Sequence, residues 1–309
     1  MSSEFKKNHV VAIDDFTVDE IRTILDLAEE MTPIVEGKKI NKDFEGKILA
    51  TLFFEPSTRT RLSFEAAMKR MGGRCIGFAR PGTSSAKKGE SLADTIRVAA
   101  GYADMIVLRH PQEGAAQLAS KFSDVPVINA GDGAGHHPTQ TLLDLFTIRK
   151  EKGSISDNHI GIAGDLKYGR TVHSLTKALS MFETEMTFIS PPSLRMPKEI
   201  IDMLKRKGVK FQEVKNIEET LSNLDILYMT RIQRERFPSD EDYKKVARSY
   251  HLEREMLENS KDDLKVMHPL PRVDEIKADV DETPKARYFE QAANGVPTRM
   301  ALLKLLQEV

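Results

Sequence analysis

The most informative part of the sequence is KILATLFFEPSTRTRLSFEAAMKRMGG, residues 47–73. Residues 47–55 form an apolar run that ends at an acid and a proline, which predicts a buried β-strand. Residues 61–73 predict a helix that stops at a pair of glycines. Between them lie three hydroxyl side chains and an arginine. A strand that leads through a polar loop into a helix is the repeating unit of α/β proteins.

The same alternation of strand and helix continues along the chain. It predicts an α/β fold with two lobes, each a mainly parallel sheet flanked by helices. A polar stretch at 150–158 separates the two series, so we expect domains at 1–150 and 151–292. Further strands are predicted at 74–79, 103–110, 125–131, 159–165, 186–191, 209–214, 225–230 and 264–271, with a helix at 137–150 and an amphipathic helix at the end of the chain.

Composition excludes several classes of protein. The chain has 309 residues, a formal net charge of −1 and one cysteine. The near-neutral charge disfavours a nucleic-acid-binding protein, and no apolar run is long enough for a membrane span. A lone Cys75 cannot form an internal disulfide, and the first residues lack the apolar core of a secretory signal. We expect a cytoplasmic enzyme or binding protein.

Polar clusters follow the predicted strands in both halves of the chain. Ligands of open α/β sheets bind outside the carboxyl ends of the strands. We therefore expect an active site in a cleft between the two lobes. The clusters are PSTRTR at 56–61, RH at 109–110, DGAGHHPTQ at 132–140, DLKYGR at 165–170, RIQRER at 231–236 and HPLPR at 268–272.

The first cluster has the composition of an oxyanion pocket. A helix start leaves amide N–H groups unpaired and carries partial positive charge. Ser57, Thr58 and Thr60 add hydroxyl donors, and the planar Arg59 can hold two oxygens at once. A phosphate would fit. The alternative is a Ser/Thr helix cap beside two solvated arginines, and composition alone leaves it open.

His137 and Gln140 stand three residues apart at another predicted helix start. A histidine there could donate to a carbonyl oxygen that gains negative charge, although a capping or packing histidine remains an alternative. Metal binding is disfavoured, because the adjacent His136 and His137 have poor ligand spacing and no carboxylate cluster accompanies them.

Arg170 and Arg231 each follow a strand of the second half, and two separated guanidiniums suit a substrate with two carboxylates. Solvated surface arginines are the alternative. The loop at 84–97 carries hydroxyls and lysines. In HPLPRVDE at 268–275, an X-Pro bond could present an exposed carbonyl as an acceptor, or simply form a rigid turn.

Taken together, the motifs resemble the catalytic chains of the aspartate carbamoyltransferase family, in order and from about residue 40 to the end. They are FFEPSTRTRLSFE, LRHPQEG, HPTQTLLDLFTI, GDLKYGRTVHSL, YMTRIQ, HPLPRVDEI and YFEQAANGV. The resemblance implies transfer of a carbamoyl group from carbamoyl phosphate to L-aspartate in pyrimidine biosynthesis. It also implies that no metal or cofactor takes part, and that residues 293–309 pack back on a carbamoyl-phosphate domain while 151–292 form an aspartate domain.

The resemblance also assigns roles by matching position. Arg59, Thr60, Arg109 and His137 are expected to be catalytic, and Lys88, Arg170, Arg231 and Gln233 to hold aspartate. The residues expected to bind carbamoyl phosphate are Ser57, Thr58, Arg59, Thr60, Arg109, His137, Gln140, and the backbone carbonyls of Leu270 and Pro271.

The resemblance further implies a homotrimer with shared active sites, in which Ser84 and Lys88 come from the neighbouring subunit. Some relatives also bind a separate zinc-bearing regulatory chain in an allosteric assembly. The sister family of ornithine carbamoyltransferases shares the Ser-Thr-Arg-Thr-Arg signature but typically has His-Cys-Leu-Pro where this chain has His268-Pro269-Leu270-Pro271. A different amine acceptor, or a non-catalytic paralogue that binds a phosphate ligand, are the alternatives.

Overall fold

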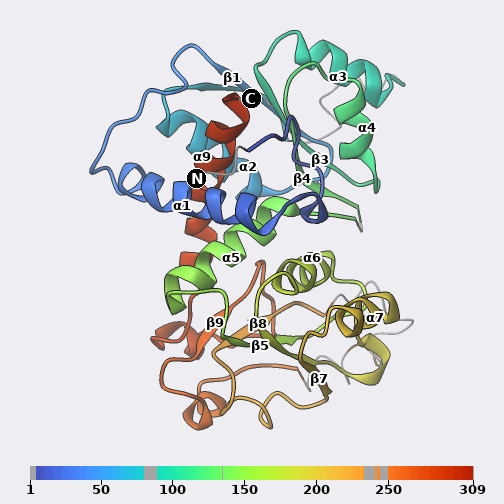
Figure 1. Cartoon of the computed structure of the whole chain (residues 1–309), viewed down its shortest axis with the longest axis vertical. Helices are drawn as coiled ribbons and strands as arrows, with labels where there is room; N and C mark the ends of the chain where they lie inside the picture. Colours follow the sequence, from blue (N-terminus) through green and yellow to red (C-terminus); the bar gives the residue numbers. More distant parts are fainter. Residues whose placement is uncertain are drawn as a thin grey trace. The chain divides into compact units, whose positions relative to one another are not determined.

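The computed structural model describes residues 5–79, 89–133, 135–232, 241, 243 and 250–308. The chain divides into two compact units (Figure 1), Met1–Phe146 with Ala293–Val309, and Thr147–Ala292. Both divisions fall inside helices, α5 (Pro138–Lys152) and α9 (Tyr288–Gln307). The first lies a few residues before the boundary expected between residues 150 and 151.

The first unit is built on a parallel sheet in the strand order β2-β1-β3-β4. The central strand β1 is the apolar run of the opening motif, and its residues from Leu49 to Phe53 are buried. A continuous apolar run of this kind is expected of a parallel strand covered on both faces. The strands are β1 (Ile48–Phe53), β2 (Arg74–Phe78), β3 (Met105–His110) and β4 (Val127–Asp132).

Helices connect and cover these strands. Helix α1 (Val18–Val35) begins with a capping box in which Thr17 and Glu20 satisfy each other's backbone N–H groups. The other helices are α2 (Thr58–Arg70), α3 (Leu92–Ala100) and α4 (Ala115–Lys121). Helix α9 begins at Tyr288, earlier than the sequence indicated. Its later part belongs to the first unit, where Arg299 lies over the Phe64 ring of α2, 4.9 Å from the centroid.

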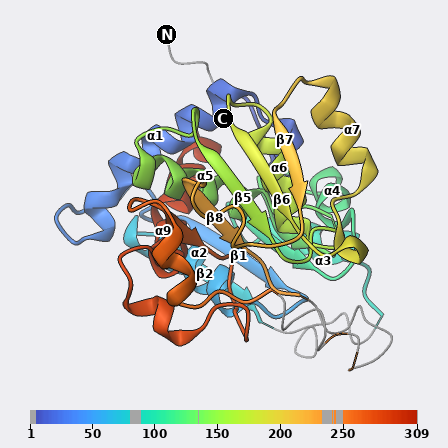
Figure 2. The same cartoon turned by 90° about the horizontal axis from the view of Figure 1, so that it is seen from below.

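The second unit has a parallel sheet in the order β7-β6-β5-β8-β9, whose strands β5, β6 and β7 lie side by side in Figure 2. Its elements are β5 (His159–Ala163), α6 (Arg170–Leu179), β6 (Glu185–Ile189), α7 (Lys198–Arg206), β7 (Phe211–Val214), β8 (Ile226–Met229) and β9 (Lys265–Met267). Short 3₁₀ helices occur at Ile13–Asp15 in the first unit and at Pro192–Leu194, Glu255–Asn259 and Ala278–Glu282 in the second. The prediction of an α/β fold with two parallel sheets is confirmed.

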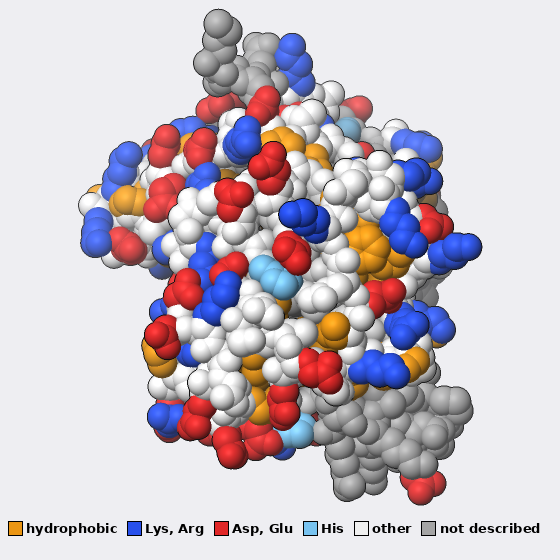
Figure 3. All heavy atoms as spheres, turned by 60° about the horizontal axis from the view of Figure 1, so that its bottom comes forward, with side chains coloured by type: hydrophobic (Ala, Val, Ile, Leu, Met, Phe, Trp, Pro, Cys, Tyr) orange, Lys and Arg blue, Asp and Glu red, His pale blue; other side chains and the backbone are white. Residues whose placement is uncertain are grey.

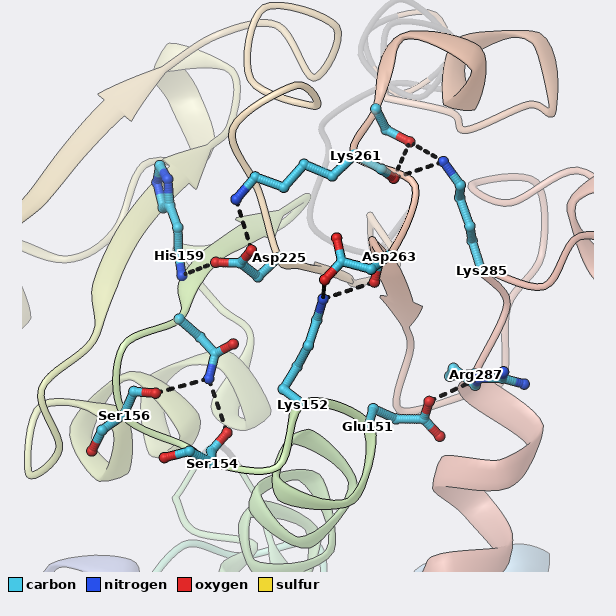
Figure 4. A network of polar contacts seen from close by, with 12 residues as sticks. Glu151, Lys152, Ser154, Ser156, His159, Asp225, Lys261, Asp263, Lys285 and Arg287 are labelled. Carbon is cyan, nitrogen blue, oxygen red and sulfur yellow. Dashed lines mark hydrogen bonds and ion pairs between the residues drawn. The ribbon is translucent and has the colours of Figure 1, made fainter.

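A polar network fixes the end of α5 within the second unit (Figure 4). The Lys152 ammonium donates to Asp263 at 2.7 Å, and Lys261 pairs with Asp225 at the same distance. Asp225 also accepts from the backbone N–H of His159, where β5 begins. These groups stand near the amino ends of β5, β8 and β9, opposite the carboxyl ends that bear the polar motifs. We assign the network a structural role.

The surface in Figure 3 shows basic and acidic side chains interspersed, without a large field of one sign. This distribution agrees with the net charge of −1. In the described part of the chain, no helix has both the length and the apolar character needed to cross a lipid bilayer.

Candidate active site

In the first unit, polar side chains meet at the carboxyl edge of the sheet. Strands β1, β3 and β4 are neighbours and run parallel, so their carboxyl ends lie along one edge. Residues 57–60 follow β1, Arg109 is the second-to-last residue of β3, and His137 follows β4. Arg109 lies within β3, as the strand predicted at 103–110 indicated, and is paired in register with Phe53.

The start of α2 is left open to an anion. Ser57 stands at the N-cap position, yet its side chain makes no capping hydrogen bond and donates instead to the Thr60 hydroxyl at 3.0 Å. Thr58 and Arg59 are exposed, while Thr60 is buried. The alternative of a simple hydroxyl cap is therefore wrong for Ser57, and the N–H groups of the first turn keep their capacity to bind a ligand.

The two arginines of the motif have different roles. Arg61 donates to Glu65 at 2.6 Å, one turn along the same helix, so its charge is used within α2. Among the described residues, no carboxylate pairs with Arg59. Partial burial lowers the pKa of the Arg59 guanidinium, since burial penalises an uncompensated charge. Arg59 is thus the cation of this motif that remains available to a ligand.

Arg109 is a buried cation held from two sides. Its Nη2 donates to Glu55 at 3.1 Å and its Nη1 to the carbonyl of Ala130 at 3.0 Å, and the residue is 8% exposed. Burial lowers the pKa of Arg109, Glu55 opposes this effect, and the charge of Arg59 lowers the pKa further. The buried Nε has no partner among the described residues. Two neighbouring guanidiniums with N–H donors that remain available to a ligand are expected at a site that binds a doubly charged anion.

The start of α5 contributes His137 and Gln140. His137 is buried, with Nδ1 3.5 Å from the Thr139 hydroxyl. The Gln140 side chain donates through Nε2 to the fully buried Asp144 at 2.9 Å. A carboxylate can only accept hydrogen bonds when ionised. This contact orients the amide and leaves the Gln140 carbonyl oxygen to accept from a ligand N–H group.

Sequence reasoning did not identify three supporting carboxylates, Glu55, Asp132 and Asp144. Asp132 is buried at the end of β4 and accepts from the side chain of Asn129 and the backbone N–H groups of Gly114 and His136. It thereby shapes the loop that leads to His137. The sequence signals were the position of Glu55, directly between strand and motif, and that of Asp132, at the start of the polar cluster 132–140.

In the second unit, a corresponding set follows β5, β8 and β9, which are adjacent and parallel. Arg170 begins α6, Arg231 follows β8, and Leu270-Pro271 follow β9. The Leu270–Pro271 bond is cis, and Leu270 has a φ of 53°. The expected residues that the structure describes are therefore placed at the carboxyl edge of their own sheet in each half.

Three expected site residues, Ser84, Lys88 and Gln233, lie outside the described residues. Across residues 5–79, 89–133, 135–232 and 250–308, with 241 and 243, no group of three or more His, Cys, Asp and Glu side chains could hold a metal ion.

Comparison with known families accounts for almost the whole chain. Residues 8–150 match the model of the carbamoyl-P binding domain of aspartate/ornithine carbamoyltransferase. Residues 156–306 match the Asp/Orn binding domain of the same family.

Individual proteins of this family also match nearly the whole chain. The aspartate carbamoyltransferase catalytic subunit of Methanothrix thermoacetophila is 57% identical over 303 residues, covering 98% of this chain and 99% of its own. The structure of the catalytic subunit of M. jannaschii aspartate transcarbamoylase superposes with a TM-score of 0.94 at 56% identity, covering 98% of both chains. The Trypanosoma cruzi enzyme in complex with N-(phosphonacetyl)-L-aspartic acid gives a TM-score of 0.92 at 38% identity, covering 98% of this chain and 96% of that one.

Proposed function

This chain belongs to the aspartate/ornithine carbamoyltransferase family, and we infer that it is an aspartate carbamoyltransferase. It transfers the carbamoyl group of carbamoyl phosphate to the amine of L-aspartate, giving N-carbamoyl-L-aspartate and phosphate. The relatives of 54–57% identity share this activity in their names, and the bisubstrate ligand of the T. cruzi enzyme joins a phosphonate to aspartate. The product belongs to pyrimidine biosynthesis.

The observation that carries the proposal is the anion site at the carboxyl edge of the first sheet. The uncapped start of α2, Arg59, and the buried Nε of Arg109 all offer donors that have no acceptor in the part of the protein that the structure describes. The phosphate of carbamoyl phosphate supplies acceptors and a compensating double charge. Ser57, Thr58, Arg59, Thr60 and Arg109 bind it.

The reaction proceeds by attack of the aspartate amine on the carbamoyl carbon, which makes the carbonyl oxygen anionic. Thr60, Arg109 and His137 donate to that oxygen, and preorganised donors of this kind are usually the largest catalytic term. The Gln140 carbonyl and the carbonyls of Leu270 and Pro271 accept from the carbamoyl NH₂. The bond to the phosphate oxygen breaks, and the departing phosphate takes the proton released by the amine.

Selection of the amine depends on the second unit. The two carboxylates of aspartate are bound by Arg170, Arg231 and Gln233 of this unit, together with Lys88 of the neighbouring chain. Guanidiniums at these positions repel the cationic side chain of ornithine. Proline at 269, where ornithine enzymes typically have cysteine, agrees with this choice.

A direct assay tests the function. Purified protein with carbamoyl phosphate and aspartate is expected to form carbamoyl aspartate and phosphate in equal amounts. In a panel of amines that includes ornithine, aspartate should give the largest kcat/KM. Phosphate release without carbamoyl aspartate, or a preference for ornithine, would contradict the proposal.

Arg231→Ala is expected to raise the KM for aspartate by about tenfold or more, since a charge-assisted hydrogen bond contributes roughly 1.5–3 kcal/mol. The KM for carbamoyl phosphate should stay near the wild-type value, because Arg231 is not among the residues proposed to bind carbamoyl phosphate. Steady-state kinetics with each substrate varied in turn provides the measurement. A parallel rise in both constants would show that the variant disturbs the protein generally.

The assembly we propose is a cytoplasmic homotrimer in which Ser84 and Lys88 serve the site of the neighbouring chain. An exposed apolar hollow on the first unit, beside edge strand β2, supports association. Its rim includes Ile76, Val98 and Tyr102, which are 41%, 48% and 67% exposed, and such patches mark interaction surfaces. A separate zinc-bearing regulatory chain is a further partner that some relatives use.

Subunit mixing tests the shared site. Arg59→Ala and Lys88→Ala chains, each nearly inactive alone, should regain activity when they are mixed and allowed to exchange. A hybrid trimer then contains a site in which both residues are present. The recovered activity is measured against each variant incubated alone under the same exchange conditions. Absence of recovery after exchange has been demonstrated by mass would contradict shared sites.

A further inference from the structure

His268 connects the Leu270 backbone to a buried carboxylate. Its Nδ1 accepts from the backbone N–H of Leu270 at 2.8 Å, and its Nε2 lies 2.8 Å from Oε1 of Glu275. Both side chains are buried, with His268 at 2% and Glu275 at 7% exposure. The other oxygen of Glu275 accepts from the N–H groups of Val273 and Asp274 at 3.0 and 3.1 Å.

These partners determine where the proton of the imidazole lies. Because the Leu270 N–H is a donor, Nδ1 must be the acceptor and carries no proton. The ring proton is then on Nε2 and is donated to Glu275. Although burial raises the pKa of Glu275, the hydrogen bond from His268 and those from the backbone hold this pKa below its usual range. The carboxylate thus remains an acceptor and selects one tautomer of the ring.

The Leu270 conformation needs such support. A φ of 53° lies in the left-handed region, which is unfavourable for a non-glycine residue. Conformations of this kind persist when surrounding contacts over-determine them. Here the N–H of Leu270 is held by His268, and the N–H of His268 is held by the side chain of the fully buried Gln291 at 2.8 Å.

We propose that Glu275 and His268 are positioning residues that aim the carbonyl groups of Leu270 and Pro271 at the NH₂ of carbamoyl phosphate. The inference rests on the proposed function and deepens it. In this relay, the Glu275 carboxylate orients the His268 imidazole, and the imidazole holds the Leu270 backbone that recognises this NH₂ group. Neither side chain touches the substrate. Their effect is confined to ligands that carry an N–H donor at this place.

Two substitutions of one residue separate the two contacts of the ring. In His268→Asn the amide oxygen can take the place of Nδ1 and accept from Leu270, while the contact with Glu275 is lost. In His268→Gln the amide reaches toward Glu275, while the acceptor for Leu270 is lost. His268→Gln should raise the KM for carbamoyl phosphate roughly tenfold, and His268→Asn by less than about threefold, the scale of one hydrogen bond.

Inorganic phosphate provides the control ligand, because it has no NH₂ group. Its inhibition constant should be the same in both variants and the wild type, and the KM for aspartate should be unchanged. The thermal midpoints of the variants are compared in parallel. Equal KM values in the two variants, or a loss of phosphate binding that follows the loss of carbamoyl phosphate binding, would overturn the inference and leave an ordinary structural role.

Glu275→Gln decides the question if the His268 variants do not fold. A neutral amide has one acceptor oxygen. When that oxygen keeps the two backbone N–H groups, the amide NH₂ faces Nε2 of His268 and the ring proton moves to Nδ1, which can then no longer accept from Leu270. The same selective rise in the KM for carbamoyl phosphate is expected, and an unchanged value would refute the relay. Failure of the wild-type protein to form carbamoyl aspartate would instead refute the proposed function itself.

Discussion

Arg59→Ala is expected to lower kcat/KM for carbamoyl phosphate by about 10²- to 10³-fold, the usual effect of removing one preorganised donor from a site where charge is bound or develops. Arg59 has no carboxylate partner among the described residues, and its charge acts on Arg109. Alanine leaves the phosphate with one guanidinium and the start of α2. Steady-state kinetics with saturating aspartate, together with direct measurement of phosphate binding, provides the test.

Arg61→Ala is the matched control for this experiment. It removes the same side chain two residues further along α2, where the guanidinium pairs with Glu65. A helix pair of this kind contributes about 0.3–0.5 kcal/mol to stability, so activity should change by less than about twofold. Near-normal turnover in Arg59→Ala, or an equal loss in both variants, would refute the assignment of the phosphate site to Arg59.

His137→Ala is expected to lower kcat by about 10²- to 10³-fold with a smaller change in the KM for carbamoyl phosphate. In the proposed mechanism His137 donates to the carbonyl oxygen, which becomes anionic only during the reaction. An interaction made mainly in the transition state affects kcat more than substrate binding. Kinetics with carbamoyl phosphate varied at saturating aspartate separates the two constants.

His136→Ala controls for disturbance of the α5 start. His136 is the adjacent residue of the same type, and its backbone N–H contact with Asp132 survives the substitution. We expect nearly unchanged kinetics. A similar loss of kcat in both variants would mean that the loop conformation, and not the His137 imidazole, is what the reaction requires.

Much of the candidate site could be predicted from sequence because its residues stand in short local motifs. Residues 57–60 follow an apolar run and begin a helix, and both features depend on neighbours in the chain. The resemblance of these motifs to a known family then supplied roles. Element ends were predicted less well. The start of α9 at Tyr288 lies earlier than predicted, because the end of a helix depends on packing as well as on local pattern.

The supporting carboxylates were not predicted. Asp132 and Asp144 have partners only three or four residues away, but local sequence does not show that these acids are buried. The partner of Glu55 is remote in sequence. Glu55 meets Arg109 across two neighbouring strands. Composition alone gives no indication that one acid rather than another will be buried beside a cation.

The sequence by itself determined the alternation of strand and helix, the order of the polar motifs and the residue types available to bind an anion, since these depend on local propensity and spacing. Only the tertiary structure decided which polar side chains bind other groups of the protein and which remain available to a ligand. Glu55 and the carbonyl of Ala130, both remote in sequence, each accept from one nitrogen of Arg109, whereas its buried Nε has no partner among the described residues. The same holds for His268, whose tautomer is set by Leu270 and Glu275. Hydrogen bonding and desolvation depend on the distances between folded segments, and those distances exist only once the chain has packed.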